Sequence, residues 1–324
     1  MVSAPAPLVS IAIRAFRRRW LREAIDSVLS QTHSDLELVL YDDAGDLEDV
    51  ARTYADPRLR YHRATARYGP SGRFLAAAAL CRGRYLGMLD DDDRYEPTFV
   101  ERLVGVLERD SEVGVAFCRT TWQNDHTRHV PFDPRPEGRQ PHAAADMIGH
   151  GRIVTPSLML MRRSALDATQ RAHPMPDGVA PDLFLNVGLA VTGWQHWLVD
   201  EHLSICRWHS GQLSRRFPSA RDVAIATWQA LPLDDAALAK ARQSQLARTL
   251  LLRALERLQT GDTSGARTDL ASARHADPRR WGSARLLLGA AARMGVAGRL
   301  ACAAAEALPV AKRRRNRPPA AVGH

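Results

Sequence analysis

Cysteine is scarce in this sequence of 324 residues. The four cysteines are far apart, and no two of them form a C-x-x-C pair: Cys81, Cys118, Cys206 and Cys302. This spacing argues against a structural zinc site and against a disulfide framework. Such sparse cysteine is typical of a reducing compartment, so we expect a cytoplasmic protein.

Long apolar runs are lacking as well. The apolar stretch at residues 8–13 is short, and its arginines follow it instead of preceding it, so it does not have the pattern of a secretion signal. The nearest candidate for a membrane span, residues 286–311, is interrupted by Arg293 and Arg299. The sequence predicts no spanning helix, which leaves open a peripheral contact with the inner face of a membrane.

Positive charge is in excess, with a net charge of +9; much of it is arginine spread along the chain, which ends in a basic run at residues 312–317. A basic tail of this kind is usually a solvated end, although it would also suit anionic lipid headgroups. Aromatic residues make up only 6% of the chain, and none is interleaved with the basic residues of this tail. A nucleic-acid partner is therefore not expected.

The first part of the chain alternates short apolar runs with helical patterns, which predicts an α/β fold with a mostly parallel sheet flanked by helices. The stretch 124–142 is polar and proline-rich and is interpreted as a long loop near the site. Strands are expected at 9–13, 36–41, 60–62, 85–89, 113–118 and 157–161, with two short strands in 195–206; helices are expected from Leu21, at 72–81, from Pro97 and at 182–190.

The composition changes after residue 218, where strand signals vanish and alanine, leucine and arginine dominate. We expect an α/β domain at 1–218, a small all-α C-terminal region at 219–311 and a basic tail at 312–324. Two helices are expected in that region, one through residues 247–258 and one at 266–276. Residues 255–281 faintly resemble a tetratricopeptide-type pair, but a single unit favours a helical cap.

The strongest chemical signal is the run of four aspartates, Asp90 to Asp93, directly after the apolar strand at 85–89. Open α/β sheets bind their ligands at the carboxyl ends of their strands. Adjacent carboxylates repel one another unless water or a cation stabilises them, and Mg²⁺ and Mn²⁺ prefer oxygen ligands. A metal site and a solvated acidic turn both fit this cluster taken alone.

A second acidic pair, Asp42 and Asp43, follows the strand at 36–41. Parallel strands bring their carboxyl ends to the same edge of a sheet, so both acidic clusters should meet there. An isolated Asp-Asp after a strand is usually a turn or a helix cap. It is the combination of the two clusters that favours a metal-assisted site.

The sequence resembles the family-2 glycosyltransferases of the GT-A fold over roughly residues 8–215. The matching text is VSIAIRAFRRRWLREAIDSVLSQTHSDLELVLYDDAG and, further on, YADPRLRYHRATARYGPSGRFLAAAALCRGRYLGMLDDDDRYEP. The resemblance implies an inverting transfer of a sugar from a nucleotide diphosphate-sugar, with a UDP-sugar favoured, to an acceptor hydroxyl.

The resemblance also implies a donor nucleotide site. Phe16 matches the aromatic residue that lies against the base, and Asp43 matches the aspartate that hydrogen-bonds the base, typically uracil. Arg73 falls where the family has an arginine near the diphosphate. Asp91 is placed near the ribose and the donor sugar.

The D-x-D region of the family covers Asp90, Asp91 and Asp92, which implies Mn²⁺ or Mg²⁺ with Asp90 and Asp92 as metal residues and Asp92 as the direct ligand. His209 matches a basic segment near the donor phosphates, where it would contact metal or phosphate, and a structural role is equally open. Residues 182–215 align with the stretch that holds the catalytic base, which places that base at Asp182.

Two departures from the family pattern bear on the site. Residues 14–17 read Arg-Ala-Phe-Arg where a proline-threonine-tyrosine-asparagine run is common, and Pro181 precedes Asp182 where glutamate is usual. Both departures leave the metal residues and the base in place. They leave open the identity of the donor nucleotide and the orientation of the base.

Two rival functions and the acceptor stay open. The alternative from another class is a catalytically degenerate GT-A domain that serves as a binding or scaffold protein. A nucleotidyltransferase is disfavoured, because residues 14–19 contain no glycine for a phosphate loop. The acceptor is unidentified, and a glycan, a lipid, a protein and a natural product all remain open; the C-terminal helices could bind it, form a homodimer or contact a membrane.

Overall fold

The computed structural model describes residues 8–16, 19–124, 126–151, 154–209 and 219–281. Contacts divide the chain into two compact units, residues 1–242 and 243–324. The division therefore falls later than residue 218, where the composition changes. The part of the expected helical region at 282–311 and the expected basic tail at 312–324 lie outside the described residues.

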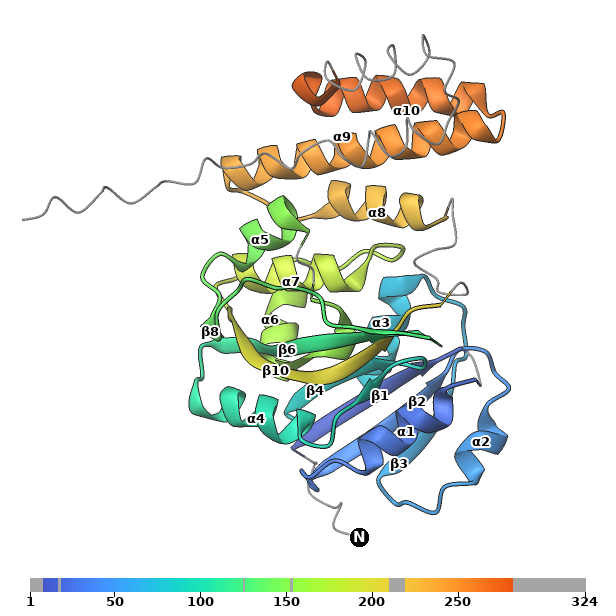
Figure 1. Cartoon of the computed structure of the whole chain (residues 1–324), viewed down its shortest axis with the longest axis vertical. Coiled ribbons are helices and arrows are strands. Elements are labelled where there is room, and N and C mark those ends of the chain that lie inside the picture. The colour runs from blue at the N-terminus through green and yellow to red at the C-terminus, as the bar shows by residue number, and fades with distance from the viewer. Residues whose placement is uncertain (1–7, 17–18, 125, 152–153, 210–218, 282–324) are drawn as a thin grey trace, which may run out of the picture. The chain divides into compact units, whose positions relative to one another are not determined.

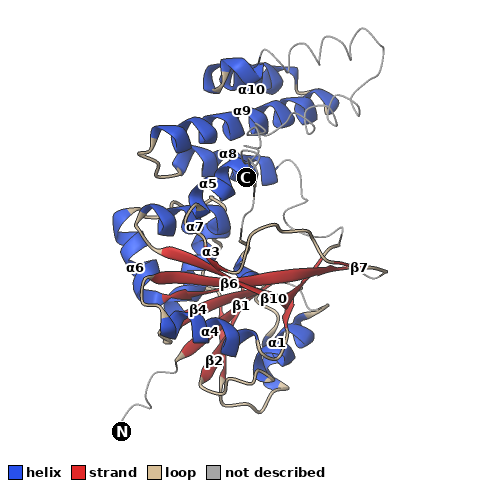
Figure 2. Ribbon diagram, turned by 60° about the vertical axis from the view of Figure 1, so that its left-hand side comes forward, coloured by secondary structure: helices blue, strands red, loops and turns tan. Residues whose placement is uncertain are grey.

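The first unit contains one mixed sheet with the strand order β3-β2-β1-β4-β9-β6-β10-β5, from which β7 and β8 branch off (Figure 2). Strands β3, β2, β1 and β4 run parallel to one another, and β6 and β10 form a second parallel pair. Strand β9 is antiparallel to both β4 and β6, between which it lies. The strands are β1 (Val9–Ala15), β2 (Leu36–Asp42), β3 (Leu59–Arg63), β4 (Tyr85–Asp90), β5 (Arg94–Tyr95), β6 (Val113–Gln123), β7 (Arg128–His129), β8 (Gly138–Arg139), β9 (Met159–Arg162) and β10 (Gln195–Arg207).

Helices cover both faces of this sheet, with α1 and α4 on one face and α3, α6 and α7 on the other (Figure 1). The predicted α/β fold class is thus confirmed. The helices of this unit are α1 (Leu21–Leu29), α2 (Glu48–Arg52), α3 (Pro70–Leu80), α4 (Phe99–Arg109), α5 (Ala143–His150), α6 (Arg163–Ala172), α7 (Pro181–Val191) and α8 (Ser219–Ala230), with a 3₁₀ turn η1 (Pro156–Leu158).

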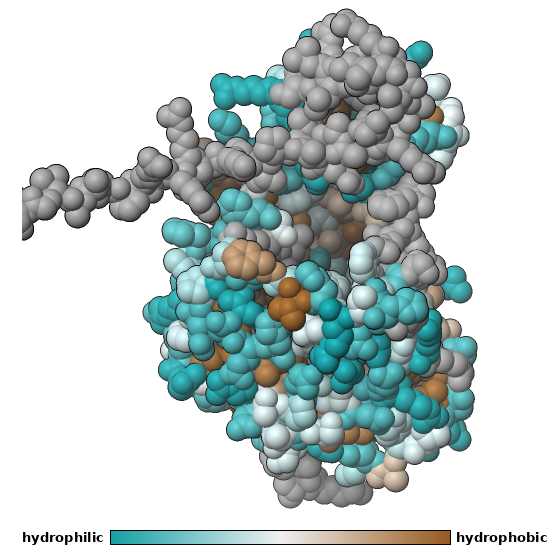
Figure 3. Space-filling view, in the orientation of Figure 1, coloured by the Kyte–Doolittle hydropathy of each residue, from teal (hydrophilic) through white to brown (hydrophobic). Residues whose placement is uncertain are grey.

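The central strands are apolar because both of their faces are covered. Every residue of β2 is buried, and β1 and β4 each have only one residue that is partly accessible. This explains why their sequences show continuous apolar runs instead of the alternation of a strand with one wet face. The face of the molecule shown in Figure 3 is mostly hydrophilic, with apolar residues scattered across it.

Several predicted elements differ from the structure. Residues 195–206 were expected to form two short strands, but β10 is a single strand of 13 residues. Its register against β6 shifts between Val199 and Ser204, and this irregular polar stretch resembles a turn in sequence. The strand expected at 157–161 begins only at Met159, because η1 precedes it. The stretch 124–142 holds the short strands β7 and β8, and helices α2, α5 and α6 were not foreseen.

The described part of the second unit contains most of α9 (Ala236–Gln259), which begins in the first unit, and α10 (Thr263–Ala276). Both expected helices are present. Asp262 caps α10 by accepting a hydrogen bond from the Gly265 N–H at 2.8 Å. Asp269 is 1% exposed and lies 2.6 Å from Arg253 and 3.0 Å from Arg257, so its buried charge is paired. Among the described residues, no helix has both the length and the apolar character needed to span a membrane.

A buried histidine makes the stability of the fold depend on pH. His196 in β10 is 1% exposed, and burial, assisted by repulsion from Arg135, lowers its pKa to about 4. In the unfolded chain the imidazole titrates near 6.5. As the pH falls from about 6.5 to about 4, the unfolded state therefore binds more protons than the folded state does. The free energy of unfolding falls by up to about 3 kcal/mol over this range.

We expect His196→Gln to flatten this dependence. Urea unfolding at pH 7 and pH 5 should show a smaller loss of stability in His196→Gln than in the unaltered protein, although the variant will be less stable at pH 7. His126→Gln, at an exposed position, is the control and should keep the original dependence. An unchanged pH dependence in His196→Gln would assign the effect to other groups.

Candidate active site

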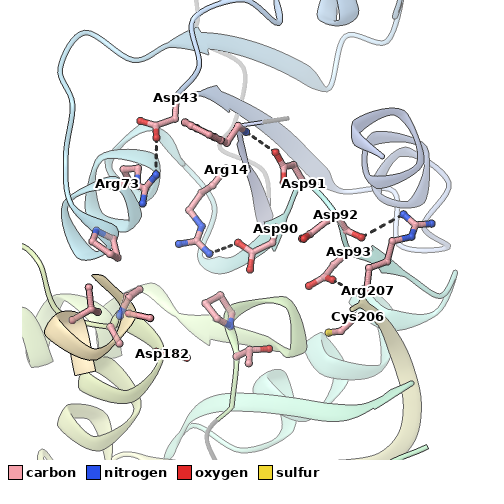
Figure 4. A pocket seen from close by; sticks show the side chains of 18 of the residues that line it. Arg14, Asp43, Arg73, Asp90, Asp91, Asp92, Asp93, Asp182, Cys206 and Arg207 are labelled. Carbon is pink, nitrogen blue, oxygen red and sulfur yellow. Dashed lines mark hydrogen bonds and ion pairs between the residues drawn. The ribbon is translucent and has the colours of Figure 1, made fainter. Parts of the chain in front are cut away.

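A cavity of about 630 Å³ opens at the carboxyl ends of β1, β2 and β4. The strand register explains why acidic residues gather here: Arg14 on β1 lies opposite Asp90 on β4, and Ala15 lies opposite Asp42 on β2. Residues far apart in the chain thus line one space, as Figure 4 shows. The lining residues are Arg14, Phe16, Asp43, Pro70, Arg73, Asp90, Asp91, Asp92, Asp93, Trp122, Thr155, Pro156, Ala180, Pro181, Asp182, Cys206, Arg207, Ala220, Val223 and Ala224.

The two aspartates after β2 have different roles. Asp42 is fully buried and accepts hydrogen bonds from the Gly45 and Leu47 N–H groups at 2.6 and 2.9 Å, so it shapes the following turn. Asp43 lines the cavity and pairs with Arg73 Nη1 at 2.8 Å. Only the second of the pair therefore belongs to the site.

The side chains of the four aspartates at the end of β4, which Figure 4 labels, each have a separate partner. Asp90 forms an ion pair with Arg14, and Asp91 Oδ2 accepts from the Phe16 N–H at 2.5 Å. These partners anchor the acidic turn to the end of β1.

The last two aspartates are held from the end of β10. Asp92 Oδ2 lies 2.8 Å from His209 Nε2, and Asp93 Oδ1 accepts from the Arg207 N–H at 2.9 Å. The structure thus places His209 beside the acidic cluster.

The pKa values of the cluster show that its charges are crowded. Burial and repulsion from Asp90 raise the pKa of Asp92, while His209 opposes the shift. Burial, together with repulsion from Asp92 and Asp90, raises the pKa of Asp93 well above its usual value. A bound cation would relieve this repulsion, because it favours the ionised carboxylates.

The side chains of the acidic cluster and His209 fit a divalent cation that takes its remaining ligands from a bound substrate and water. Asp92 and His209 offer an oxygen and a nitrogen side by side, whereas Asp93 is committed to the backbone of Arg207. Within the described ranges, no three histidine, cysteine or acidic side chains form a complete metal-holding group. Mg²⁺ and Mn²⁺ sites commonly use one or two protein ligands and take the rest from phosphates and water, which is the arrangement that these residues allow.

Asp182 lies in the first turn of α7 and lines the same cavity as the acidic cluster (Figure 4). Pro181 occupies the first turn of this helix, where proline is well tolerated, so the departure from the family pattern does not disturb the helix. The Asn186 side chain fixes this turn by donating to the Asp182 carbonyl at 2.7 Å and to the Val154 carbonyl at 3.1 Å. Burial raises the pKa of Asp182, and Arg14 opposes that shift.

All predicted donor residues reach the same cavity. Phe16 is 42% exposed, so its ring is available to a ligand, and Arg73 extends from α3 towards Asp43. Sequence reasoning noted Arg14 only as a departure and did not assign Trp122 or α8 to the site. The charged residues of the site could be picked out in the sequence, but the residues of α8 that line the cavity, Ala220, Val223 and Ala224, are small and apolar and have no chemical signature.

Helix α3 is capped from a distant segment. Its N-cap residue is Gly69, which has no side chain to accept a hydrogen bond. Asp177, in the loop before α7, instead accepts from the Gly69 N–H at 3.1 Å and the Gly72 N–H at 3.0 Å. A Cβ atom at Gly69 would lie 2.6 Å from this carboxylate, which explains the glycine. The contact links the helix that carries Arg73 to the loop that leads to Asp182.

This sheet, with an acidic cavity at the ends of its central strands, has the GT-A fold that was expected from the sequence. The S. aureus TarS 1–349 structure in complex with UDP-GlcNAc superposes with a TM-score of 0.65 over 85% of this chain and 83% of that one, at 13% sequence identity. At this identity the likeness establishes the fold alone.

Residues 10–169, just under half of the chain, match the model of glycosyl transferase family 2. The chain is 36% identical over 124 residues to a chondroitin synthase of Escherichia coli, a match of 36% of this chain and 18% of that protein. It is 33% identical over 108 residues to an uncharacterized glycosyltransferase of Rickettsia felis, a match of 32% of this chain and 18% of that protein. The chain thus spans less than a fifth of these relatives.

The Asp177 contact predicts a measurable effect on stability. Asp177→Ala should lower the free energy of unfolding by about 1 kcal/mol, the usual cost of losing a helix N-cap acceptor, and Asp177→Asn should cost less because an amide oxygen still accepts. Urea unfolding at pH 7 measures both. Asp167→Ala, at an exposed site on α6, should leave stability nearly unchanged. Equal stability of Asp177→Ala and Asp167→Ala would contradict the capping role.

Proposed function

We propose that this protein is an inverting glycosyltransferase that transfers a sugar from a nucleotide diphosphate-sugar, with a UDP-sugar favoured, to an acceptor hydroxyl. The observation that carries the proposal is that one cavity collects Asp43, Arg73, the acidic cluster and Asp182. The TarS complexes with UDP-GlcNAc and UDP support the choice of nucleotide. A cytoplasmic location, expected from the cysteine content, is part of the same proposal.

The donor nucleotide would occupy the part of the cavity next to β1 and β2. The exposed ring of Phe16 would lie against the base, and Asp43 would accept a hydrogen bond from a base N–H. Arg73 is already held by Asp43 at 2.8 Å, so its guanidinium is oriented before a diphosphate arrives. Asp91, fixed by the Phe16 N–H at 2.5 Å, would face the ribose and the sugar.

Asp92, with Asp90 and His209 beside it, would hold Mn²⁺ or Mg²⁺. Asp92 is the direct ligand in this proposal, because Asp90 is paired with Arg14. When bound, the cation supplies positive charge that stabilises the departing diphosphate. Arg73 adds a fixed positive charge to the same group.

Asp182 would act as the general base. The acceptor hydroxyl attacks the anomeric carbon, its proton moves to the Asp182 carboxylate, and the bond between that carbon and the diphosphate oxygen breaks. Burial raises the pKa of this carboxylate, which brings its proton affinity closer to that needed at neutral pH. Arg14 opposes the shift and so helps to keep the carboxylate ionised.

The donor site is tested by thermal unfolding with UDP, GDP, dTDP and CDP, each with Mn²⁺, Mg²⁺ or EDTA. We expect UDP with either metal to raise the melting temperature by about 5 °C or more at a hundredfold excess over Kd, since a ligand that binds only the folded state stabilises it. EDTA should abolish most of this rise. No shift with any nucleotide, in a folded protein, would favour the scaffold alternative.

Two substitutions separate the roles of the carboxylates. Asp182→Asn should lower kcat by about 10²–10⁴-fold while it leaves the UDP shift intact, because it removes only the proton acceptor. Asp92→Asn should reduce the metal-dependent part of the UDP shift as well as turnover. Asp167→Asn, on the exposed side of α6, should change neither. Full activity in Asp182→Asn would remove Asp182 from the mechanism.

A further inference from the structure

The cavity has two chemically different walls. One carries the charged groups of the proposed donor site, from Asp43 and Arg73 to Asp93 and Arg207. The other, here named the apolar wall, consists of the lining residues at the start of α7 and on α8: Ala180, Pro181, Ala220, Val223 and Ala224. Asp182 follows directly after Pro181 in the chain, so the proposed base lies next to this wall.

Helix α8 supplies a large part of the apolar wall. Ala220, Val223, Ala224 and Thr227 recur at the spacing of one helical face, and the first three line the cavity. Thr227 is fully buried, and its hydroxyl accepts from the Ala180 N–H at 2.8 Å and donates to the Val223 carbonyl at 2.6 Å. This anchors α8 to the start of α7, so the small apolar side chains are held on the same side of the cavity as Asp182.

This wall is poorly suited to a sugar ring. A sugar buries several hydroxyl groups, each of which needs a hydrogen-bond partner, because an unpaired buried polar group is costly. None of the five residues of this wall has a polar side-chain group, and Asp182 is the polar side chain next to it. The small apolar side chains of α8 and of the start of α7 instead suit an apolar ring.

We propose that the acceptor is an apolar ring compound bearing a hydroxyl, an aglycone that lies against the apolar wall, and not a sugar residue. This inference rests on the proposed function. The cavity of about 630 Å³ must also hold the donor, so it has room for only the reacting end of the acceptor. A new bond joins the ring hydroxyl oxygen to the anomeric carbon, the diphosphate leaves with the electron pair of the broken bond, and the proton passes to Asp182.

The test uses the full chain saturated with UDP and Mg²⁺, titrated with 2-naphthol as the ring probe and with methyl glucoside as the sugar probe. We expect 2-naphthol to bind, by its fluorescence and by a further rise in melting temperature, and methyl glucoside to have no effect. Ala224→Asn should weaken 2-naphthol binding about tenfold, because it places an amide on the apolar wall. Its UDP shift should be unchanged.

Ala226→Asn is the matched control. It makes the same substitution on the same helix at a similarly half-buried position outside the cavity, so it carries the same cost in helix propensity. The proposal is overturned if methyl glucoside binds and 2-naphthol does not, or if both variants bind 2-naphthol as the unaltered protein does. A chain that shows no UDP shift fails earlier, at the proposed function, so the two failures are distinguishable.

Discussion

Mutual repulsion of carboxylates at one edge of the sheet is the constraint around which this site is built. Four consecutive aspartates leave β4, and three of them, Asp91 to Asp93, are buried. Each needs its own compensation, because like charges in a buried site raise one another's pKa. The structure supplies a guanidinium to Asp90, a backbone N–H to Asp91, an imidazole to Asp92 and a second backbone N–H to Asp93.

These compensating groups explain why distant segments converge. Arg14 and Phe16 come from the end of β1, whereas Arg207 and His209 come from the end of β10, more than a hundred positions away. Burial and repulsion between the carboxylates still raise the pKa values of Asp92 and Asp93. A cation bound together with a diphosphate would relieve this repulsion. The hydrogen bonds and ion pairs that hold this edge of the sheet together therefore also position the residues of the proposed site.

The loop between α6 and α7 joins the two sides of the cavity. Asp177 in this loop caps the helix that carries Arg73, and a few residues later the chain begins the helix that carries Asp182. Thr227 then ties α8 to the same helix start. The side proposed for the acceptor is thus held by hydrogen bonds between elements that are not neighbours in the sheet.

Local pattern was enough to predict the fold class, the central strands and the residues that carry charge. Apolar runs such as that of β2 are legible because a strand buried on both faces has no polar positions. Asp43 and the acidic cluster were predicted as site residues because they follow such strands, and Asp182 was predicted because it aligns with a residue of a known family. The different roles of two adjacent aspartates could not be predicted. Asp42 and Asp43 look alike in sequence, and only the hydrogen bond from the Gly45 N–H shows that Asp42 is structural.

Tertiary structure alone decided which residues share a space. The polar stretch within β10 looks like a turn, but its pairing with β6 makes it part of one long strand that delivers Arg207 to Asp93. The change of composition after residue 218 suggested a boundary, yet α8 belongs to the first unit and lines its cavity. Sequence determines which groups are available, because charge and apolar period are local properties. Contacts between segments far apart in the chain depend on packing, which no local pattern records.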